Sequence, residues 1–365
     1  VYDSFNVSDT VSATQGGAFS GPIFSNTLGT NNLRLGKFAG DSITAGGNFN
    51  LTVGDEAGTA LTTGDQNVMV GYQSGLSLTT SSQNTLIGAK AGDALVSGGQ
   101  NVALGYNALN SDTLGSVSVA IGRSALGAQN FTTATNSHNV AIGYTAGASI
   151  TTGVKNVIIG NEAGDGAQTI DESVIIGYGA GTAVMTGHDN VLVGAHAGAA
   201  LTAGASNVAV GYSALKTEDG NGLNVAVGFK ALEDQNAGAD AHNVAVGYSA
   251  GLNLTTATFT TLVGGLAGGV GVMTGNNNTA IGHRAGEDLV AGDANTIVGS
   301  FAGLSFVGGA DNVAIGTSAL DIDTNGRKSV AVGRNALGTQ NFATLTDSHN
   351  AVSYTHLTLP TIYSV

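Results

Sequence analysis

Seven histidines are the first candidates for catalysis or metal binding in this chain. Three of them, His138, His242 and His349, recur at the same point of an internal repeat, each directly before an Asn. A catalytic centre is usually single, so a position copied three times is more typical of a turn. His196 and His283 lack the second histidine that a helical zinc motif requires. We therefore expect no catalytic, metal or cofactor-binding residue and no cofactor.

Adjacent carboxylates are the second candidates, because glycoside hydrolysis uses two of them. The pairs are Asp55/Glu56, Glu218/Asp219, Glu233/Asp234 and Glu287/Asp288. Neighbouring residues of a strand point to opposite sides, and these pairs fall at several positions of the repeat. We interpret them as solvated surface. A carbohydrate-active tail spike, with its site between chains or in another domain, stays as an alternative.

A recurring tyrosine is the remaining candidate for binding. It occurs as Tyr72, Tyr106, Tyr144, Tyr178, Tyr212 and Tyr248. An exposed aromatic row could stack on sugar rings, so these six residues are possible ligand contacts. They could equally pack over a corner of the backbone with the hydroxyl in water. Threonine pairs such as Thr62/Thr63 suggest an ice-binding ladder as a further alternative, although they skip many repeats.

These residues lie in a short repeat that runs through most of the chain. The stretch NVAVGYSAL (207–215) is one of eighteen copies, and the spacing between their shared glycines is mostly 17 residues, with exceptions of 18, 19 and 21. The first Asn is position 1 and the shared Gly is position 5. A short fixed period is the signature of a solenoid, in which each coil stacks only on its neighbours.

The repeat itself predicts the secondary structure. Its β-branched run closed by Gly indicates a strand of about five residues, and we expect a second strand later in each coil. Seventeen residues with several glycines leave too little room for a helical hairpin. The sequence therefore predicts an all-β, parallel β-solenoid of about 18 coils.

The inside and outside of the coil follow from strand alternation, which places positions 2 and 4 on one side and position 3 on the other. We assign positions 2 and 4 to the interior. Position 3 then faces outward, yet it is apolar in all copies except those with Arg34 and Thr52. Because a monomer rarely leaves a long apolar stripe in water, we expect a homo-oligomer.

A longer period is superimposed on the first. Position 9 is Gly in four consecutive coils and then Leu in two. These leucines are Leu109 and Leu126, Leu215 and Leu232, and Leu320 and Leu337. Extra residues follow the second Leu coil each time, so six coils form a super-repeat of about 105 residues, which is typical of block duplication.

Three segments result. Residues 1–31 lack the period and are a linker or N-terminal cap, and residues 32–351 form the repeat array. The ending VSYTHLTLPTIYSV (352–365) shares nothing with the repeat and resembles a translated sequencing adapter, so we regard it as non-native.

Composition excludes several classes of protein. The formal net charge of −14 argues against a nucleic-acid partner, which would need clustered Lys and Arg. No stretch approaches 18 consecutive apolar residues, so we expect no membrane insertion. The chain has no Cys, which rules out disulfides and thiolate metal sites.

The repeat carries a family resemblance. NVAIGYTAG (139–147), NTAIGHRAG (278–286) and SVAVGRNAL (329–337) resemble the YadA-like head repeats of trimeric autotransporter adhesins, and similar repeats of phage tail-fibre proteins. The resemblance covers about residues 32–350, although those heads commonly use units shorter than 17 residues. It implies a left-handed β-roll, a homotrimer, and an extracellular place on a virion or bacterial surface. It also implies attachment to a host glycan or protein, so we expect a non-enzymatic surface fibre or adhesin segment.

Overall fold

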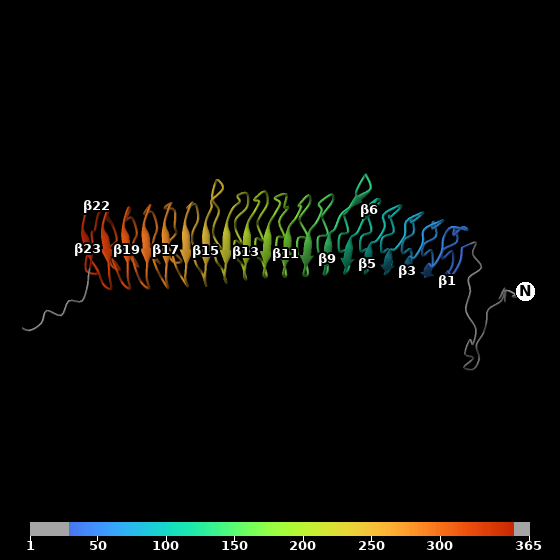
Figure 1. Cartoon of the computed structure of the whole chain (residues 1–365), viewed down its shortest axis with the longest axis horizontal. Helices are drawn as coiled ribbons and strands as arrows, with labels where there is room; N and C mark the ends of the chain where they lie inside the picture. The colour runs from blue at the N-terminus through green and yellow to red at the C-terminus, as the bar shows by residue number, and fades with distance from the viewer. Residues whose placement is uncertain (1–28, 354–365) are drawn as a thin grey trace, which may run out of the picture.

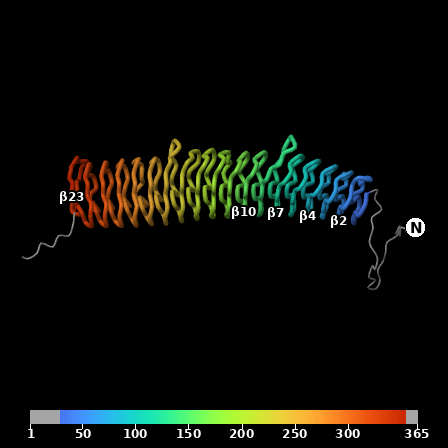
Figure 2. Tube along the Cα trace, viewed as in Figure 1, coloured from blue at the N-terminus to red at the C-terminus, as the bar shows by residue number. Residues whose placement is uncertain are grey.

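The computed structural model describes residues 29–353 and is a long row of stacked coils (Figures 1 and 2). It contains strands and turns but no helix in that range. Most of residues 1–31, expected to be a linker or cap, and residues 354–365 of the adapter-like ending lie outside the described residues.

One strand per coil joins a single parallel sheet of nineteen strands. These strands are β1 (Leu33–Leu35), β2 (Leu51–Val53), β3 (Val68–Val70), β4 (Thr85–Ile87), β5 (Val102–Leu104), β7 (Val119–Ile121), β9 (Val140–Ile142), β10 (Val157–Ile159), β11 (Val174–Ile176), β12 (Val191–Val193), β13 (Val208–Val210), β14 (Val225–Val227), β15 (Val244–Val246), β16 (Thr261–Val263), β17 (Thr279–Ile281), β18 (Thr296–Val298), β19 (Val313–Ile315), β21 (Val330–Val332) and β23 (Ala351–Ser353).

Successive coils pair in strict register. Leu192 of β12, for example, lies beside Ala209 of β13, so position 3 stacks on position 3. The expected parallel β-solenoid with a period near 17 residues is confirmed. A nineteenth coil adds to the eighteen predicted, because β23 pairs with β21. Val352 and Ser353, the first two residues of the adapter-like ending, belong to this last strand.

The strands have three residues rather than five, because the backbone turns at both ends of each strand. Asp189 before β12 has φ 60°, and Gly194 after it has φ 136°. The expected second strand is wrong for most coils. Two-residue strands occur in two places only within residues 29–353, and they are β6 (Gly115–Ser116) with β8 (Thr135–Asn136), and β20 (Gly326–Arg327) with β22 (Thr346–Asp347).

The later half of the coil is therefore mostly turns, for a geometric reason. Left-handed residues at positions 7 and 9, such as His196 and Gly198, bend the chain repeatedly within a few residues. Neighbouring coils still bond through their backbones there, as in the bond from Thr62 N–H to the Thr79 carbonyl of 2.8 Å. Longer coils loop outward, and one such loop projects beside β6 in Figure 1.

The position-5 glycine is required by both its conformation and its surroundings. All eighteen have φ between 123° and 142°, which strains any residue with a side chain. A Cβ on Gly194 would lie 2.4 Å from the carbonyl oxygen of Gly211 in the next coil. The prediction of a positive φ or a close backbone approach is confirmed in both respects.

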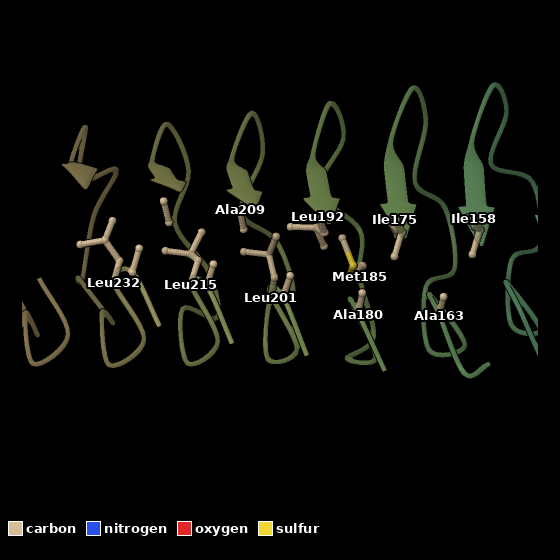
Figure 3. Packing of buried hydrophobic residues seen from close by; sticks show 14 of the residues in the cluster. Ile158, Ala163, Ile175, Ala180, Met185, Leu192, Leu201, Ala209, Leu215 and Leu232 are labelled. Atoms are coloured by element: carbon tan, nitrogen blue, oxygen red, sulfur yellow. The ribbon is translucent and has the colours of Figure 1, made fainter. Parts of the chain in front are cut away.

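The inside–outside assignment made from the sequence is wrong. Position 3 is buried in every strand of the nineteen-stranded sheet from β2 to β21, whereas positions 2 and 4 are half-buried or exposed (for example in β12). Figure 3 shows Leu192 and Ala209 pointing from the strands toward Leu201 and Leu215 on the opposite wall. The coil is narrow, so one strand side chain per coil fills it, together with Ala at position 8 and an aliphatic side chain from the turns.

In each six-coil block, the two coils with Leu instead of Gly at position 9 keep the volume of this core unchanged. Each Leu at position 9 lies in a coil with Ala at position 3, such as Leu215 with Ala209, and both are fully buried. Coils with Gly at position 9 tolerate a large position 3, such as Leu192. Close packing thus explains why the two positions vary together.

Position 1 forms a buried amide ladder. The Asn190 side-chain oxygen accepts a bond from the Asn207 backbone N–H at 3.0 Å, and its Nδ2 donates to the Gly204 carbonyl at 2.9 Å. Ser or Thr replaces Asn in four coils and is equally buried. The predicted role of this residue, bonding the backbone of the turn and its counterpart in the neighbouring coil, is confirmed.

Candidate ligand-contact surface

The six tyrosines proposed as ligand contacts lie on the surface at position 6. Each is between 43% and 59% exposed. They follow the sheet at the turn after the position-5 glycine, in the third, fifth, seventh, ninth, eleventh and thirteenth coils. Tyrosine therefore occurs in every second coil, at a spacing of about 9.6 Å if each coil rises about 4.8 Å.

Planar side chains from the intervening coils lie between several of these rings. Phe229 stacks on Tyr212 and Tyr248, with centroid distances of 5.3 and 5.4 Å and interplanar angles of 14° and 4°. His196 lies edge-on between Tyr178 and Tyr212, at 5.4 and 6.1 Å. Tyr212, Phe229 and Tyr248 are thus stacked face to face, whereas His196 meets its two tyrosines edge to face.

A guanidinium group occupies one of these intervening positions. The Arg123 Cζ lies over Tyr106 and Tyr144, at 5.8 and 5.7 Å from the two ring centroids. Tyr106, Tyr144, Tyr178, Tyr212 and Tyr248 thus pack against side chains of the intervening coils and remain partly exposed, and their role as ligand contacts stays a prediction.

The recurring histidines occupy turns. His138, His242 and His349 have φ between 50° and 52°, the left-handed conformation shared by the residue before position 1 in each coil. His188 lies on another turn, where its Nδ1 accepts the Asp171 backbone N–H at 2.9 Å. Within residues 29–353, no three His, Cys, Asp or Glu side chains come together as a metal site would require.

The carboxylate pairs lie outside the strands, so the strand alternation expected for them does not apply. Glu287 is buried against Arg284, and Glu233 lies 3.0 Å from the Lys230 Nζ. Glu218 is buried without a cation, and burial raises its pKa although hydrogen bonds from Gln235 and Asn221 oppose the shift. Glu218, Glu233 and Glu287 are therefore not simply solvated surface, which corrects our interpretation for one member of three pairs.

Sequence reasoning missed a buried carboxylate–amide junction that recurs in every block. The fully buried Asp112 accepts bonds from the Gln129 Nε2 at 2.6 Å and from the backbone N–H of Gly115 at 2.9 Å. Gln129 in turn accepts the Asn139 Nδ2 at 2.9 Å. Asp323 and Gln340 repeat this arrangement, and Glu218 with Gln235 provides a variant.

The signal for this junction was present in the repeat. Position 12 is aliphatic in many coils, as at Leu61 and Leu201, but it is acidic in the first Leu coil of each block and Gln in the second. Because Leu at position 9 already fills the core, position 12 is free to carry a polar group. Its carboxylate and amide then pair one coil apart.

Threonine hydroxyls of the turns are used within the solenoid. The Thr62 hydroxyl donates to the Thr79 carbonyl at 3.0 Å, and the Thr79 hydroxyl donates to the Val96 carbonyl at 3.0 Å. The same bond recurs from Thr151 to the Gln168 carbonyl. These hydroxyls hold neighbouring coils together, which is a sufficient structural reason for the threonine pairs.

The outer face of the sheet is a continuous apolar feature of the surface. Positions 2 and 4 carry mainly Val, Ile, Leu and Thr on nineteen strands, and they are half-buried or exposed. Ile87, Val246 and Ile315 are among the most exposed, between 37% and 39%. This face forms two parallel aliphatic rows along the whole solenoid.

Comparisons with known proteins leave the family open. No protein-family model matches the chain, and a search of curated proteins gives no significant match. None of the elements within residues 29–353 is an apolar helix long enough to cross a membrane.

Proposed function

We propose that this chain is an elongated structural and adhesive segment of a surface fibre, of the kind found in virion tail fibres and bacterial trimeric adhesins. It would act outside the cell or on the virion, as a left-handed roll associated with two further copies. It would hold a surface-binding element away from its base or bind a host glycan or protein along its side.

The observation that carries this proposal is the outer face of the sheet. Two rows of half-exposed aliphatic side chains along nineteen strands exceed the apolar patch that a monomer usually exposes. Burying the exposed half of one valine contributes on the order of 1 kcal/mol, so a row of such residues supports stable association. The argument for an oligomer thus moves from position 3 to positions 2 and 4.

A second copy of the chain is the occupant that best fits this face, because its own outer sheet face has the same repeat spacing. The face also carries few charges that would oppose such contact. Nineteen strands at about 4.8 Å give a length of roughly 85 Å, which suits a spacer between two surfaces. The resemblance of the repeats to trimeric adhesin heads supports three copies. The exposed tyrosine row on the adjoining turn supports contact with a glycan.

The test is the solution mass of the full chain, measured by light scattering after size exclusion. We expect a trimer. Val193→Asp places a charge on the outer sheet face and should dissociate the trimer to folded monomers, as circular dichroism would verify. Val184→Asp is the matched control, because Val184 is 55% exposed on a turn away from that face and should leave the mass unchanged.

A monomeric wild-type chain would contradict the proposed association. Equal masses of wild type and a folded Val193→Asp variant would show that the oligomer forms through another surface. Binding of the full chain to immobilised host-type glycans and matrix proteins tests the adhesive role separately. Turnover of a bacterial polysaccharide, abolished by one carboxylate substitution, would instead favour the tail-spike alternative.

A further inference from the structure

A carboxylate oxygen without a partner lies in the turn after β19, near the C-terminal end of the array (Figure 1). The Oδ1 atom of Asp321 is shielded from solvent and has no hydrogen-bond partner among the described residues. No Lys, Arg or His within residues 29–353 forms an ion pair with it. Shielding a charged oxygen is costly unless a donor or a positive charge compensates it. Asp321 therefore requires a partner from outside the chain.

The neighbours of this oxygen are backbone carbonyls. A Cβ built on Gly338, in the next coil, would lie 3.1 Å from the Asn335 carbonyl oxygen and 3.5 Å from both Asp321 Oδ1 and the Ser318 carbonyl oxygen. These three oxygens are the nearest atoms to that point outside Gly338 and its chain neighbours. The carbonyls of Ser318 and Gly338 accept no hydrogen bond within residues 29–353. Asp321 Oδ1 therefore faces acceptors rather than donors.

The first block shows what this place in the coil requires. Asn110 holds the same position there, since it is position 10 of the first Leu coil. With its amide nitrogen turned toward the backbone, Asn110 donates to the Asn107 carbonyl at 3.1 Å and to the Gly127 carbonyl at 3.0 Å. One donor thus bridges the carbonyls of two neighbouring coils.

Asp321 places an oxygen where Asn110 places that nitrogen. The bridging atom of Asn110 lies 3.6 Å from a Cβ built on Gly127, and Asp321 Oδ1 lies 3.5 Å from a Cβ built on Gly338. The carbonyls that Asn110 bridges correspond in the third block to those of Ser318 and Gly338. Three negatively polarised oxygens converge there, and they repel one another unless a positive group lies between them.

The second block brings a positive charge of its own to this position. The residue there is Lys216, whose Nζ lies 4.0 Å from Glu233 Oε1 in the next coil. In the third block the charge is reversed, so a proton or a metal ion must compensate it. A protonated carboxyl has one O–H and could bond to only one of the two carbonyls. A metal ion can contact all three oxygens at once.

The ligands select the kind of metal ion. Carboxylate and carbonyl oxygens are ligands of hard cations, and Ca²⁺ takes about six to eight of them at about 2.3–2.6 Å in variable geometry. Mg²⁺ demands a near-ideal octahedron and gives up its water reluctantly. Asp321 is half-buried, so water can complete the ligand shell from the solvent side. Because carbonyls supply most of the protein ligands, such a site does not need the cluster of three ionisable side chains that residues 29–353 lack.

We propose that Asp321 Oδ1 and the carbonyl oxygens of Ser318 and Gly338 bind one Ca²⁺ ion between the coils of β19 and β21. With a single carboxylate in the site, binding should be weak, with a Kd of about 0.1–1 mM. The ion would replace the donor of Asn110 and hold the two coils together. This inference goes beyond the proposed function and requires only the stacked coils.

The test is isothermal titration calorimetry of the full chain after removal of divalent ions, with CaCl₂ as the titrant in a NaCl buffer at neutral pH. We expect a single Ca²⁺ per chain, and binding of Mg²⁺ that is at least about tenfold weaker. Replacing NaCl by KCl should leave the Ca²⁺ affinity unchanged. No Ca²⁺ binding, equal binding of Mg²⁺, or an affinity set by the monovalent salt would overturn the proposal.

Three variants make the test specific to Asp321. Asp321→Asn recreates the arrangement of Asn110, so it should remain folded and lose the bound Ca²⁺. Asp311→Asn is the matched control, because it removes the same charge from an exposed position and should leave binding unchanged. Asn110→Asp should add a second Ca²⁺ per chain. Undiminished binding by Asp321→Asn, or equal losses in Asp321→Asn and Asp311→Asn, would refute the assignment.

Hydrogen exchange locates the bound ion. The Gly338 N–H, which donates to the Asn335 carbonyl at 3.1 Å, should exchange about tenfold more slowly at a Ca²⁺ concentration of about ten times the Kd. The Gly127 N–H, which donates to the Ser124 carbonyl at 3.2 Å, is the internal control and should not respond. An equal response of the two amides would show that Ca²⁺ acts elsewhere on the chain.

Discussion

The position-5 glycine provides the sharpest test of how the coils stack, and the change to make is Gly194→Ala. The φ of Gly194 is 136°, a conformation that costs a residue with a side chain about 1–3 kcal/mol. The new Cβ would also lie 2.4 Å from the Gly211 oxygen and 2.6 Å from its carbonyl carbon. Both neighbours are backbone atoms, so no side-chain rotation can relieve the overlap.

The coils must therefore separate locally. That movement weakens the bonds from Gly194 N–H to the Ile176 carbonyl and from Gly211 N–H to the Val193 carbonyl, both 2.7 Å long. With about 0.5–1.5 kcal/mol for each bond, the total loss in unfolding free energy is on the order of 4 kcal/mol. The damage should be greatest at β12 and β13.

Urea unfolding followed by circular dichroism measures the loss, and hydrogen exchange of the β12 and β13 amides locates it. Gly220→Ala is the matched control, because a Cβ there meets nothing within 4 Å and its φ is not positive. We expect the control to remain within about 1 kcal/mol of wild type. If Gly194→Ala and Gly220→Ala unfold alike, the inferred stacking of the position-5 glycines is wrong.

Other perturbations test the core, the junction and the ionisable groups. Leu192→Ala should lower the unfolding free energy by about 2–5 kcal/mol. Val184→Ala, on an exposed turn, should change it by about 0.5 kcal/mol at most. Equal urea midpoints for the two variants would contradict the corrected assignment of position 3 to the core. Asp112→Ala removes the acceptor of Gly115 N–H, Phe131 N–H and one Gln129 Nε2 hydrogen, and it should cost on the order of 3 kcal/mol. Wild-type stability of this variant would show that the junction is dispensable. Burial raises the pKa of Glu218 and Asp288, so both bind protons more tightly when folded. Their contribution to stability is fully present below about pH 4 and is lost as the pH rises through the folded pKa. The melting temperature should therefore fall as the pH rises from about 4, and a rise would refute this reasoning.

Much of the fold followed from local pattern. The regular glycine spacing predicted a parallel solenoid, and the buried ladder of Asn190 and Asn207 matches the expected role of position 1. The six exposed tyrosines were also identifiable, since a residue type at a fixed repeat position must form a row when coils stack. None of these inferences required knowledge of which side of the strand faces inward.

Hydrophobicity could not show which side of the strand faces the interior of the coil, because positions 2, 3 and 4 are all apolar in most coils. A size pattern did carry the answer. Leu109 occurs with Ala103 and Leu215 occurs with Ala209, as expected when positions 3 and 9 share one interior of fixed volume. The same pattern explains the junction of Asp112 with Gln129. Both residues occupy position 12, where other coils carry an aliphatic side chain, because Leu at position 9 already fills the core in their coils.

The sequence by itself therefore determined the repeat, the stacking and the turn chemistry, because these depend on residues close together in one coil. Only the tertiary structure decided that position 3 is the core, that positions 2 and 4 face outward, and that Phe229 stacks between Tyr212 and Tyr248. Those features depend on the width of the coil and on contacts between residues about 17 positions apart, which no single repeat unit contains.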